Sequence, residues 1–161
     1  MARFRFHSKW EVRAPLPAVW DAIQNSTEWP RWWRGVISVE DVEPGDEHGI
    51  GKVQNYEWKS RLPYRVRFTM RVSAIDYQSR MEGIASGEVE GGGVWHFSMR
   101  GDNTIVRYEW DVRTTPLWVN LIAPFTRRLI RWNHDQIMNW GAAGLARLLH
   151  AELIGVEHDP L

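Results

Sequence analysis

The sequence predicts an α+β fold in which a curved antiparallel sheet of about six to seven strands wraps around one long C-terminal helix, with short helices after the first strand. Apolar and charged residues alternate in successive segments, which is typical of strands with one buried face. The connections between these segments are short, and short connections require antiparallel pairing. The last part of the chain changes to a helical period, and only that helix is long enough to cover the sheet.

The first strand is expected at residues 4–13, where charged side chains alternate with mostly apolar ones. Two prolines then stop the strand, and a short amphipathic helix is expected to end near Asn25. Residues 27–35 contain too much proline, glycine and aromatic bulk for a plain helix or strand. We interpret them as a packed connection or a second short helix.

A run of strands follows, each bounded by turn residues. The cleanest alternation is in residues 64–72, where one face is apolar and the other carries arginine and threonine. The triple glycine 91–93 is interpreted as a hairpin, or as a place where the backbone passes close to another group. The expected strands are about 36–43, 50–59, 64–72, 79–89, 94–100 and 104–114.

The long helix is expected to begin with Thr115 as its N-cap and Pro116 at its first position. Pro124 either kinks this helix or begins a second one. The chain is interpreted as one ligand-binding domain, residues 1–154, followed by a loose tail, residues 155–161. The apolar stripe of the helix consists of Leu129, Ile130, Ile137, Trp140, Gly144, Leu148 and Ala151.

Composition excludes several classes of function. Twenty basic and twenty acidic side chains cancel without a dense basic cluster, so nucleic acid is not expected as a partner. The absence of cysteine excludes disulfides and thiol chemistry. It also fits a cytoplasmic location, as does an N-terminus without the apolar core of a signal peptide. The six histidines lack metal-ligand spacing, and neither a nucleophile elbow nor a phosphate loop is present. No metal and no other cofactor is expected.

The longest apolar stretch, residues 117–125, is far shorter than the roughly 20 residues of a membrane-spanning helix. No integral membrane segment is therefore expected. Three arginines follow this stretch within residues 126–131. The segment 117–131 is interpreted as a lid over a pocket or as packing on the sheet edge, with transient membrane contact as the alternative.

Eleven tryptophans indicate a bulky core, an aromatic-lined cavity, or both, and each carries one N–H that needs a partner when buried. Aromatic residues on the inward faces of four strands are expected to line a pocket, with tyrosine hydroxyls as its polar groups. The candidate ligand-binding residues on these strands are Tyr56, Trp58, Phe68, Met70, Trp95, Phe97, Tyr108 and Trp110.

The helix adds three candidate ligand-binding residues, Asn133, Ile137 and Trp140. Asn133 lies in the middle of the apolar stripe, where a buried amide needs hydrogen-bond partners. It is expected either to bond a backbone carbonyl or the loop 29–33, or to face the cavity and orient a ligand's carbonyl or hydroxyl. His134, at the edge of the stripe, is interpreted as a half-exposed packing residue.

Glu88 is a further candidate, and it depends on which face of the strand 79–89 points inward. Glu82, Ile84, Ser86 and Glu88 share one side of this strand, and the pattern leaves open whether that side is buried or solvated. If it faces the cavity, burial would raise the pKa of the Glu88 carboxyl.

Five segments carry a family resemblance. They are Ala14-Pro-Leu-Pro-Ala-Val-Trp20, Trp29-Pro-Arg-Trp-Trp33, Ala85-Ser-Gly-Glu-Val-Glu-Gly-Gly-Gly-Val-Trp95, Thr104-Ile-Val-Arg-Tyr-Glu-Trp110 and Arg131-Trp-Asn-His-Asp135. Together with the opening strand they resemble the START-like or SRPBCC superfamily, also described as polyketide cyclase/dehydrase-like, over about residues 4–153. The resemblance implies the helix-grip fold, with a deep cavity that receives lipids, sterols, polyketides or other aromatics. It implies no catalytic residue, because the superfamily shares no catalytic motif.

Two functions follow from these observations. The first is the binding of a small hydrophobic molecule, of lipid, polyketide or aromatic type, in a cavity between the sheet and the C-terminal helix. The alternative is a polyketide cyclase or dehydratase that uses general acid/base groups in that cavity. The alternative requires a carboxyl, Glu88 or another, within reach of Tyr56 or Tyr108.

Overall fold

The computed structural model describes residues 3–115 and 117–159, with only the backbone given for residues 118–120 and 122–126. Short helices follow the first strand, and a long helix follows a run of six strands, as the sequence predicts. In chain order the elements are β1 (Arg3–Arg13), α1 (Leu16–Gln24), the 3-10 helix η1 (Ser26–Glu28), α2 (Trp29–Trp32), β2 (Val36–Glu43), β3 (Val53–Lys59), β4 (Arg65–Asp76), β5 (Arg80–Gly87), β6 (Val89–Arg100), β7 (Asn103–Thr114), α3 (Leu117–Leu148) and β8 (Glu152–His158).

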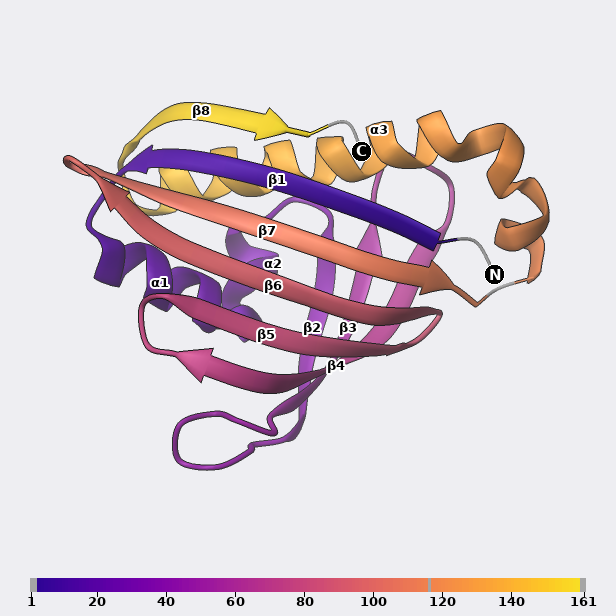
Figure 1. Ribbon diagram of the computed structural model, residues 1–161, viewed down its shortest axis with the longest axis horizontal. Coiled ribbons are helices and arrows are strands. Elements are labelled where there is room, and N and C mark those ends of the chain that lie inside the picture. Colours follow the sequence, from indigo (N-terminus) through magenta and orange to yellow (C-terminus); the bar gives the residue numbers. More distant parts are fainter. Residues whose placement is uncertain (1–2, 116, 160–161) are drawn as a thin grey trace.

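One antiparallel sheet contains eight strands in the order β2-β3-β4-β5-β6-β7-β1-β8. Figure 1 shows that the sheet is strongly curved: β2 and β3 cross the direction of β6, β7 and β1, and β4 bends from the first direction into the second. The helix α3 lies along the sheet beside β1 and β8. The predicted α+β fold, a curved antiparallel sheet around the C-terminal helix, is therefore confirmed, with one strand more than the upper end of the expected range.

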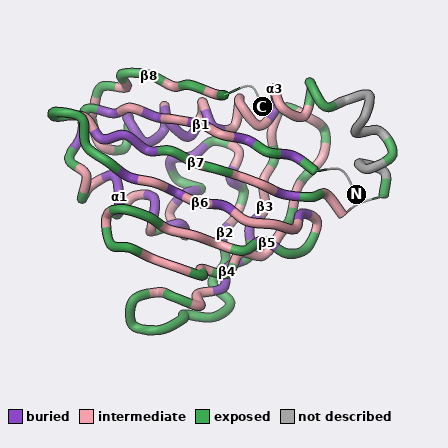
Figure 2. Tube along the Cα trace, viewed as in Figure 1, coloured by how far each residue is buried: buried purple, intermediate pink, exposed green. Residues whose placement is uncertain are grey.

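Strand β1 shows why the sheet has one dry face. Its residues alternate between exposed or half-buried and buried positions, as the sequence pattern predicts (Figure 2). Trp10 and Val12 are completely buried, while Arg5 and Arg13 are exposed. Alternation of this kind commits one face of the strand to the core.

The segment between β1 and β2 packs tryptophan against the long helix. Residues 27–35 contain part of η1, the short helix α2 and a connection, so the interpretation as a second short helix with packed bulk is confirmed. The Nε1–H of Trp33 donates to the carbonyl of Ile137 in α3 at 2.9 Å. Gly144 of α3 lies so close to the carbonyl of Trp32 that a side chain at this position would overlap it. These contacts bring α2 and α3 together over one end of the sheet.

The triple glycine lies within β6, near its start, and does not form a hairpin, so the hairpin interpretation is wrong. The other interpretation, a close backbone approach, is confirmed. A Cβ atom on Gly91 would overlap the carbonyl oxygen of Asp111 in β7, and one on Gly93 would lie 2.6 Å from the Tyr108 hydroxyl. The glycines therefore allow β6 to pass close to β7 and leave room for the Tyr108 side chain.

Helix α3 runs from Leu117 to Leu148 as one element, so Pro124 does not begin a second helix. Pro116, expected at the first position of the helix, and most side chains of the expected lid lie outside the described residues. Thr115, the expected N-cap, donates its hydroxyl to the carbonyl of Gly87 at 2.8 Å. Of that segment, Leu117 and Leu121 are exposed. Among the described residues, no helix combines the length and apolar character needed to cross a bilayer.

The C-terminal segment differs from the expected loose tail. Residues 152–158 form β8, which pairs antiparallel with β1 and shifts register between Glu11 and Val12. His158 also contacts two other elements, since its ring nitrogens lie 2.8 Å from Ser8 Oγ in β1 and 2.8 Å from Asn139 Oδ1 in α3. Backbone pairing and this bridge order a segment whose own sequence has little apolar alternation.

Candidate functional site

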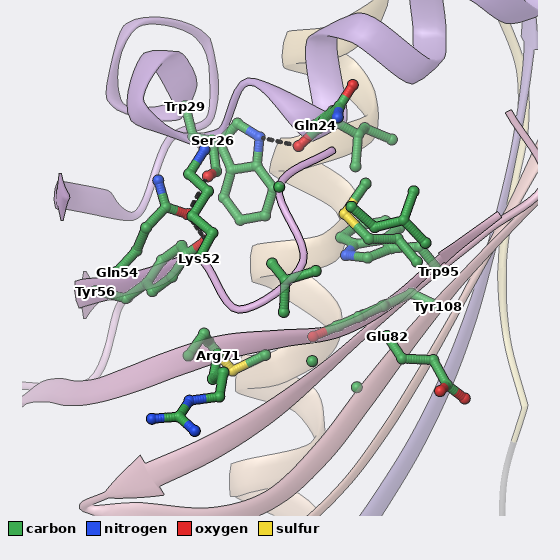
Figure 3. A pocket seen from close by; sticks show the side chains of 18 of the residues that line it. Gln24, Ser26, Trp29, Lys52, Gln54, Tyr56, Arg71, Glu82, Trp95 and Tyr108 are labelled. Carbon is green, nitrogen blue, oxygen red and sulfur yellow. Dashed lines mark hydrogen bonds between the residues drawn. The ribbon is translucent and has the colours of Figure 1, made fainter. Parts of the chain in front are cut away.

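A cavity with two lobes lies between the inner face of the sheet and the helices. The α1 lobe has a volume of about 120 Å³ and lies against α1, η1, β3 and β4 (Figure 3). The α3 lobe has a volume of about 170 Å³ and lies against β1, β7 and α3. Five aromatic side chains line both lobes and so form the wall between them; they are Trp29, Trp58, Phe68, Trp95 and Tyr108. The aromatic residues thus form the boundary of this space and do not fill it.

Ring contacts hold the wall between the lobes in place. Trp95 stacks on Tyr108 with ring centroids 4.1 Å apart. Trp58 meets Trp33 edge to face at 5.1 Å, and Trp33 is fixed by its hydrogen bond to Ile137. Aromatic pairs in these arrangements add stabilisation beyond the area they bury. The wall is therefore supported from both the sheet and the helix α3.

Nine of the twelve residues predicted for the site line this cavity. Tyr56 and Met70 line the α1 lobe alone. The four that line both lobes are Trp58, Phe68, Trp95 and Tyr108. Those that line the α3 lobe alone are Trp110, Asn133 and Ile137.

The other three predicted residues lie outside both lobes. Phe97 is buried against Trp20, with ring centroids 4.8 Å apart. Trp140 lies under the guanidinium of Arg34, which is 4.4 Å from its ring centroid. Glu88 lies at the turn between β5 and β6, where its carboxylate accepts the backbone N–H of Arg67 at 2.8 Å.

The facing of β5 explains the position of the glutamates. Ala85 is 3% exposed and Ile84 is 56% exposed, so the side with the odd-numbered residues points inward and the glutamate side points outward. Glu82 pairs with Arg80 in the same strand. Figure 3 shows the Glu82 carboxylate directed away from the α1 lobe. Met81 and Gly83 therefore line the lobe from the inward side of the strand, and Glu82 borders it with its carboxylate turned away.

A buried polar network borders the α1 lobe. The hydroxyls of Tyr56 and Ser26 both donate to Gln54 Oε1, at 3.0 Å and 2.5 Å, and Gln54 Nε2 donates to Asp41 at 2.8 Å. Burial raises the pKa of Tyr56 to about 12. The Tyr56 hydroxyl is thus neutral at pH 7, and its proton is already committed to Gln54.

Tyr108 offers a different hydroxyl. Burial, with a smaller effect from Tyr56, raises the pKa of Tyr108 far above its usual value. No hydrogen bond joins this hydroxyl to a described residue, and Figure 3 shows it extending into the α1 lobe. It is a neutral donor that is free to bond a ligand.

Three of the described residues that line the α3 lobe carry a buried polar atom without a partner: Asn133 Oδ1, Trp58 Nε1 and His134 Nδ1. Asn133 is 7% exposed, and its Oδ1 atom accepts no hydrogen bond from the described residues, neither from a backbone N–H nor from the loop 29–33. The Nε1–H of Trp58 is likewise buried and has no acceptor there. Buried polar groups in proteins are almost always paired, so these three atoms are exceptions that need an explanation.

His134 also borders the α3 lobe. Its ring stacks on Phe6 with centroids 4.0 Å apart, and burial lowers its pKa despite the opposing effect of Asp135. The imidazole is therefore neutral at pH 7. Its side chain is 15% exposed, which is less than the half-exposed position expected from the stripe.

Sequence reasoning missed several lining residues, although their signals were present. Gln54 is two residues before Tyr56 on β3, so strand alternation places both on the inner face. Because Gln54 is polar, it was not predicted to line an apolar cavity. Phe4 and Phe6 were expected to share the dry face of β1, but only the structure shows that they reach the α3 lobe. Trp29 and Trp33 come from the irregular segment, where no periodicity assigns a facing.

The chain matches a protein family and a set of solved structures. A family model described as "Polyketide cyclase / dehydrase and lipid transport" matches residues 12–138. No curated protein matches the sequence at a significant level.

Solved structures share the fold. The chain is similar to the Zhui aromatase/cyclase from a Streptomyces species, with 13% identity, a TM-score of 0.74, and 92% of this chain and 94% of that chain covered. A protein from Thermus thermophilus has 15% identity and a TM-score of 0.71, with 90% and 99% covered. A START superfamily protein from Mycobacterium smegmatis has 10% identity and a TM-score of 0.70, with 91% and 97% covered. At these identities the likeness shows the fold alone.

Proposed function

This chain belongs to the polyketide cyclase/dehydrase and lipid transport family, and we propose that within it the chain is a binding protein for a small, uncharged, largely apolar molecule of aromatic type. The observation that carries the proposal is the two-lobed cavity, whose common wall consists of five aromatic side chains. Binding sites for small molecules are concave and mostly apolar, with a few polar groups that fix orientation. The free Tyr108 hydroxyl and the unpaired atoms of Trp58 and Asn133 are such groups.

The cavity volume supports a ligand of modest size. An apolar cavity of about 150 Å³ is known to hold one benzene ring. The α3 lobe, about 170 Å³, is on this scale, and the α1 lobe, about 120 Å³, is somewhat smaller. A single ring therefore fits the α3 lobe, whereas a fused system of three or four rings requires the wall between the lobes to move.

The side chains inside favour binding over turnover. General acid/base catalysis needs a group that accepts a proton near pH 7. Tyr56 and Tyr108 hold their protons, and Glu88 lies outside both lobes. The cyclase alternative keeps one supporting observation, because the free Tyr108 hydroxyl is placed to donate to a substrate carbonyl. The base on the lining for that role is His134, a neutral imidazole with an unpaired Nδ1 atom, and burial lowers its pKa and so makes it a weaker base than an ordinary histidine.

Tryptophan fluorescence titrated with p-xylene tests the proposal, because five tryptophans border the two lobes; they are Trp29, Trp33, Trp58, Trp95 and Trp110. We expect a saturable change in the wild type. Val66→Phe, which fills part of the α3 lobe, is expected to weaken binding at least about ten-fold.

Val42→Phe is the matched control, since Val42 is 53% exposed on β2 and the substitution adds the same volume outside the cavity. Its affinity for p-xylene is expected to equal that of the wild type. Equal affinities for Val66→Phe and Val42→Phe, or no saturable change in any of the three proteins, would contradict the proposal.

A further inference from the structure

We propose that the α3 lobe selects a neutral hydroxylated aromatic, a phenol-type molecule, by pairing its hydroxyl with Asn133 and Trp58. This inference rests on the proposed function, because it names the chemical class of the ligand that the same cavity takes. It is carried by two of the three unpaired buried polar atoms on the lining of this lobe; the third, His134 Nδ1, lies 3.8 Å from the Asp135 carboxylate.

The first atom is the amide oxygen of Asn133. It belongs to a side chain that is 7% exposed, and it is surrounded on α3 by the apolar residues Ile130 and Ile137. A buried acceptor without a donor carries the full cost of its lost hydration. A ligand that donates a hydrogen bond here removes that cost, so this oxygen favours a donor over an isosteric methyl group.

The second atom is the indole N–H of Trp58. Its two tryptophan neighbours have acceptors, since Trp29 donates to Ile23 at 3.1 Å and Trp33 donates to Ile137 at 2.9 Å. Trp10 and Trp20 also lack acceptors, but neither lines a lobe. Among the described residues, Trp58 is the tryptophan with both a fully buried, unpaired N–H and a place on the cavity wall.

The two atoms belong to opposite walls of the same lobe. Trp58 comes from β3 and packs on Trp33, with ring centroids 5.1 Å apart. Trp33 in turn bonds the carbonyl of Ile137, one helical turn after Asn133 on α3. A ligand in the lobe thus has a donor on the sheet side and an acceptor on the helix side. A phenolic hydroxyl, which both donates and accepts, satisfies this pair.

Charge argues for a neutral ligand. His134 is the one histidine among the described residues that line the α3 lobe, and no acidic or basic side chain lines it beside that ring. Burial lowers the pKa of His134, so the imidazole is neutral at pH 7. A carboxylate or ammonium would enter this lobe without a counter-ion, at a high desolvation cost. A fatty acid or an aromatic acid is therefore a poorer fit than a phenol.

Calorimetric titration with p-cresol and p-xylene tests the inference, because these molecules have the same shape and differ by a hydroxyl in place of a methyl group. In the wild type we expect p-cresol to bind about ten-fold more tightly than p-xylene. Asn133→Leu and Trp58→Phe are each expected to reduce this preference by several-fold, with a much smaller change in the affinity for p-xylene. Gln136→Leu is the matched control on α3, because Gln136 lines neither lobe, and it is expected to keep the full preference.

The melting temperature of the unliganded variants gives a second readout. Replacing an unpaired buried oxygen by an apolar group of similar shape is neutral or stabilising. Asn133→Leu is therefore expected to melt at or above the wild-type temperature while losing its preference for p-cresol. A purely structural asparagine would instead lose stability on this change, so a clearly lower melting temperature overturns the role of Asn133.

The two proposals fail in different ways. If p-xylene binds but p-cresol binds no more tightly, the inference about the phenol class is wrong and the cavity remains a binding site. The same conclusion follows if Asn133→Leu and Trp58→Phe both keep the wild-type preference. If neither molecule binds, the proposed function fails together with the inference.

Discussion

At the scale of single residues, the partner of each indole N–H separates structural tryptophans from those of the site. The indole N–H of Trp33 donates to the carbonyl of Ile137 and so links the end of α2 to α3. The indole N–H of Trp58, which packs on Trp33, has no acceptor among the described residues, and Trp58 borders the cavity. Both residues are equally aromatic in the sequence, so composition predicts an aromatic interior but assigns neither role.

His134 makes a residue-scale prediction about pH. Burial holds its pKa in the folded protein below the ordinary value of 6.5, so the unfolded chain binds more protons as the pH falls through that value. The stability that the neutral ring contributes is therefore present above pH 6.5 and is lost as the pH falls toward the folded pKa. We expect the wild-type free energy of unfolding, measured by urea denaturation, to decline between pH 7.5 and 5.

His134→Phe removes this titration and keeps an aromatic ring beside Phe6, so its decline over the same pH range is expected to be shallower. His48→Phe, at an exposed position in the loop between β2 and β3, is the control and is expected to follow the wild type. Parallel curves for His134→Phe and the wild type would show that this ring is not held neutral by burial.

At the scale of elements, the strands were predictable wherever one face is buried and the other wet. β1, β4 and β7 have this pattern, and their expected positions agree with the structure within a few residues. β8 was not predictable, because none of its residues is fully buried and its order comes from pairing with β1 and from the contacts of His158. A strand that is ordered by backbone pairing with a neighbouring strand, and not by burying one of its faces, needs no alternation of apolar and polar residues in its own sequence.

The glycines of β6 give the element-scale prediction. Gly91 has φ +148°, and a Cβ there would overlap the Asp111 carbonyl oxygen of β7. Gly91→Ala is therefore expected to lower the free energy of unfolding by about 3 kcal/mol, through overlap and backbone strain together. Urea denaturation measures this change.

The neighbouring Gly92→Ala is the matched control. A Cβ on Gly92 would meet only the carbonyl oxygen of Gly83, at 3.3 Å, and Gly92 does not have a positive φ. We expect a loss for Gly92→Ala of less than half that for Gly91→Ala. Equal losses would mean that the close approach of β6 to β7 at Gly91 does not limit what this position accepts.

At the scale of the whole molecule, the sequence predicts the sheet and helix that surround the cavity better than it predicts which side chains line the cavity. A one-sided sheet and one long helix determine that the dry faces meet, and alternation correctly placed Tyr56, Phe68 and Trp110 on the inner side. The facing of β5 was undecidable, because its inward side carries only Met81, Gly83, Ala85 and Gly87, which are too small or too varied to mark a core. The absence of Glu88 from both lobes follows from that facing and from the turn in which it lies.

The central claim is that the aromatic-walled cavity inside the fold takes an aromatic ligand, and a crystal structure of the protein soaked with iodobenzene tests it most directly. The anomalous signal of iodine locates the ligand without ambiguity, and a single ring suits the 170 Å³ of the α3 lobe. We predict an iodine site in the α3 lobe, in contact with Trp58, Phe68 or Trp110. Iodine found only on the outer faces, with the side chains of the wall collapsed into both lobes, would contradict the claim.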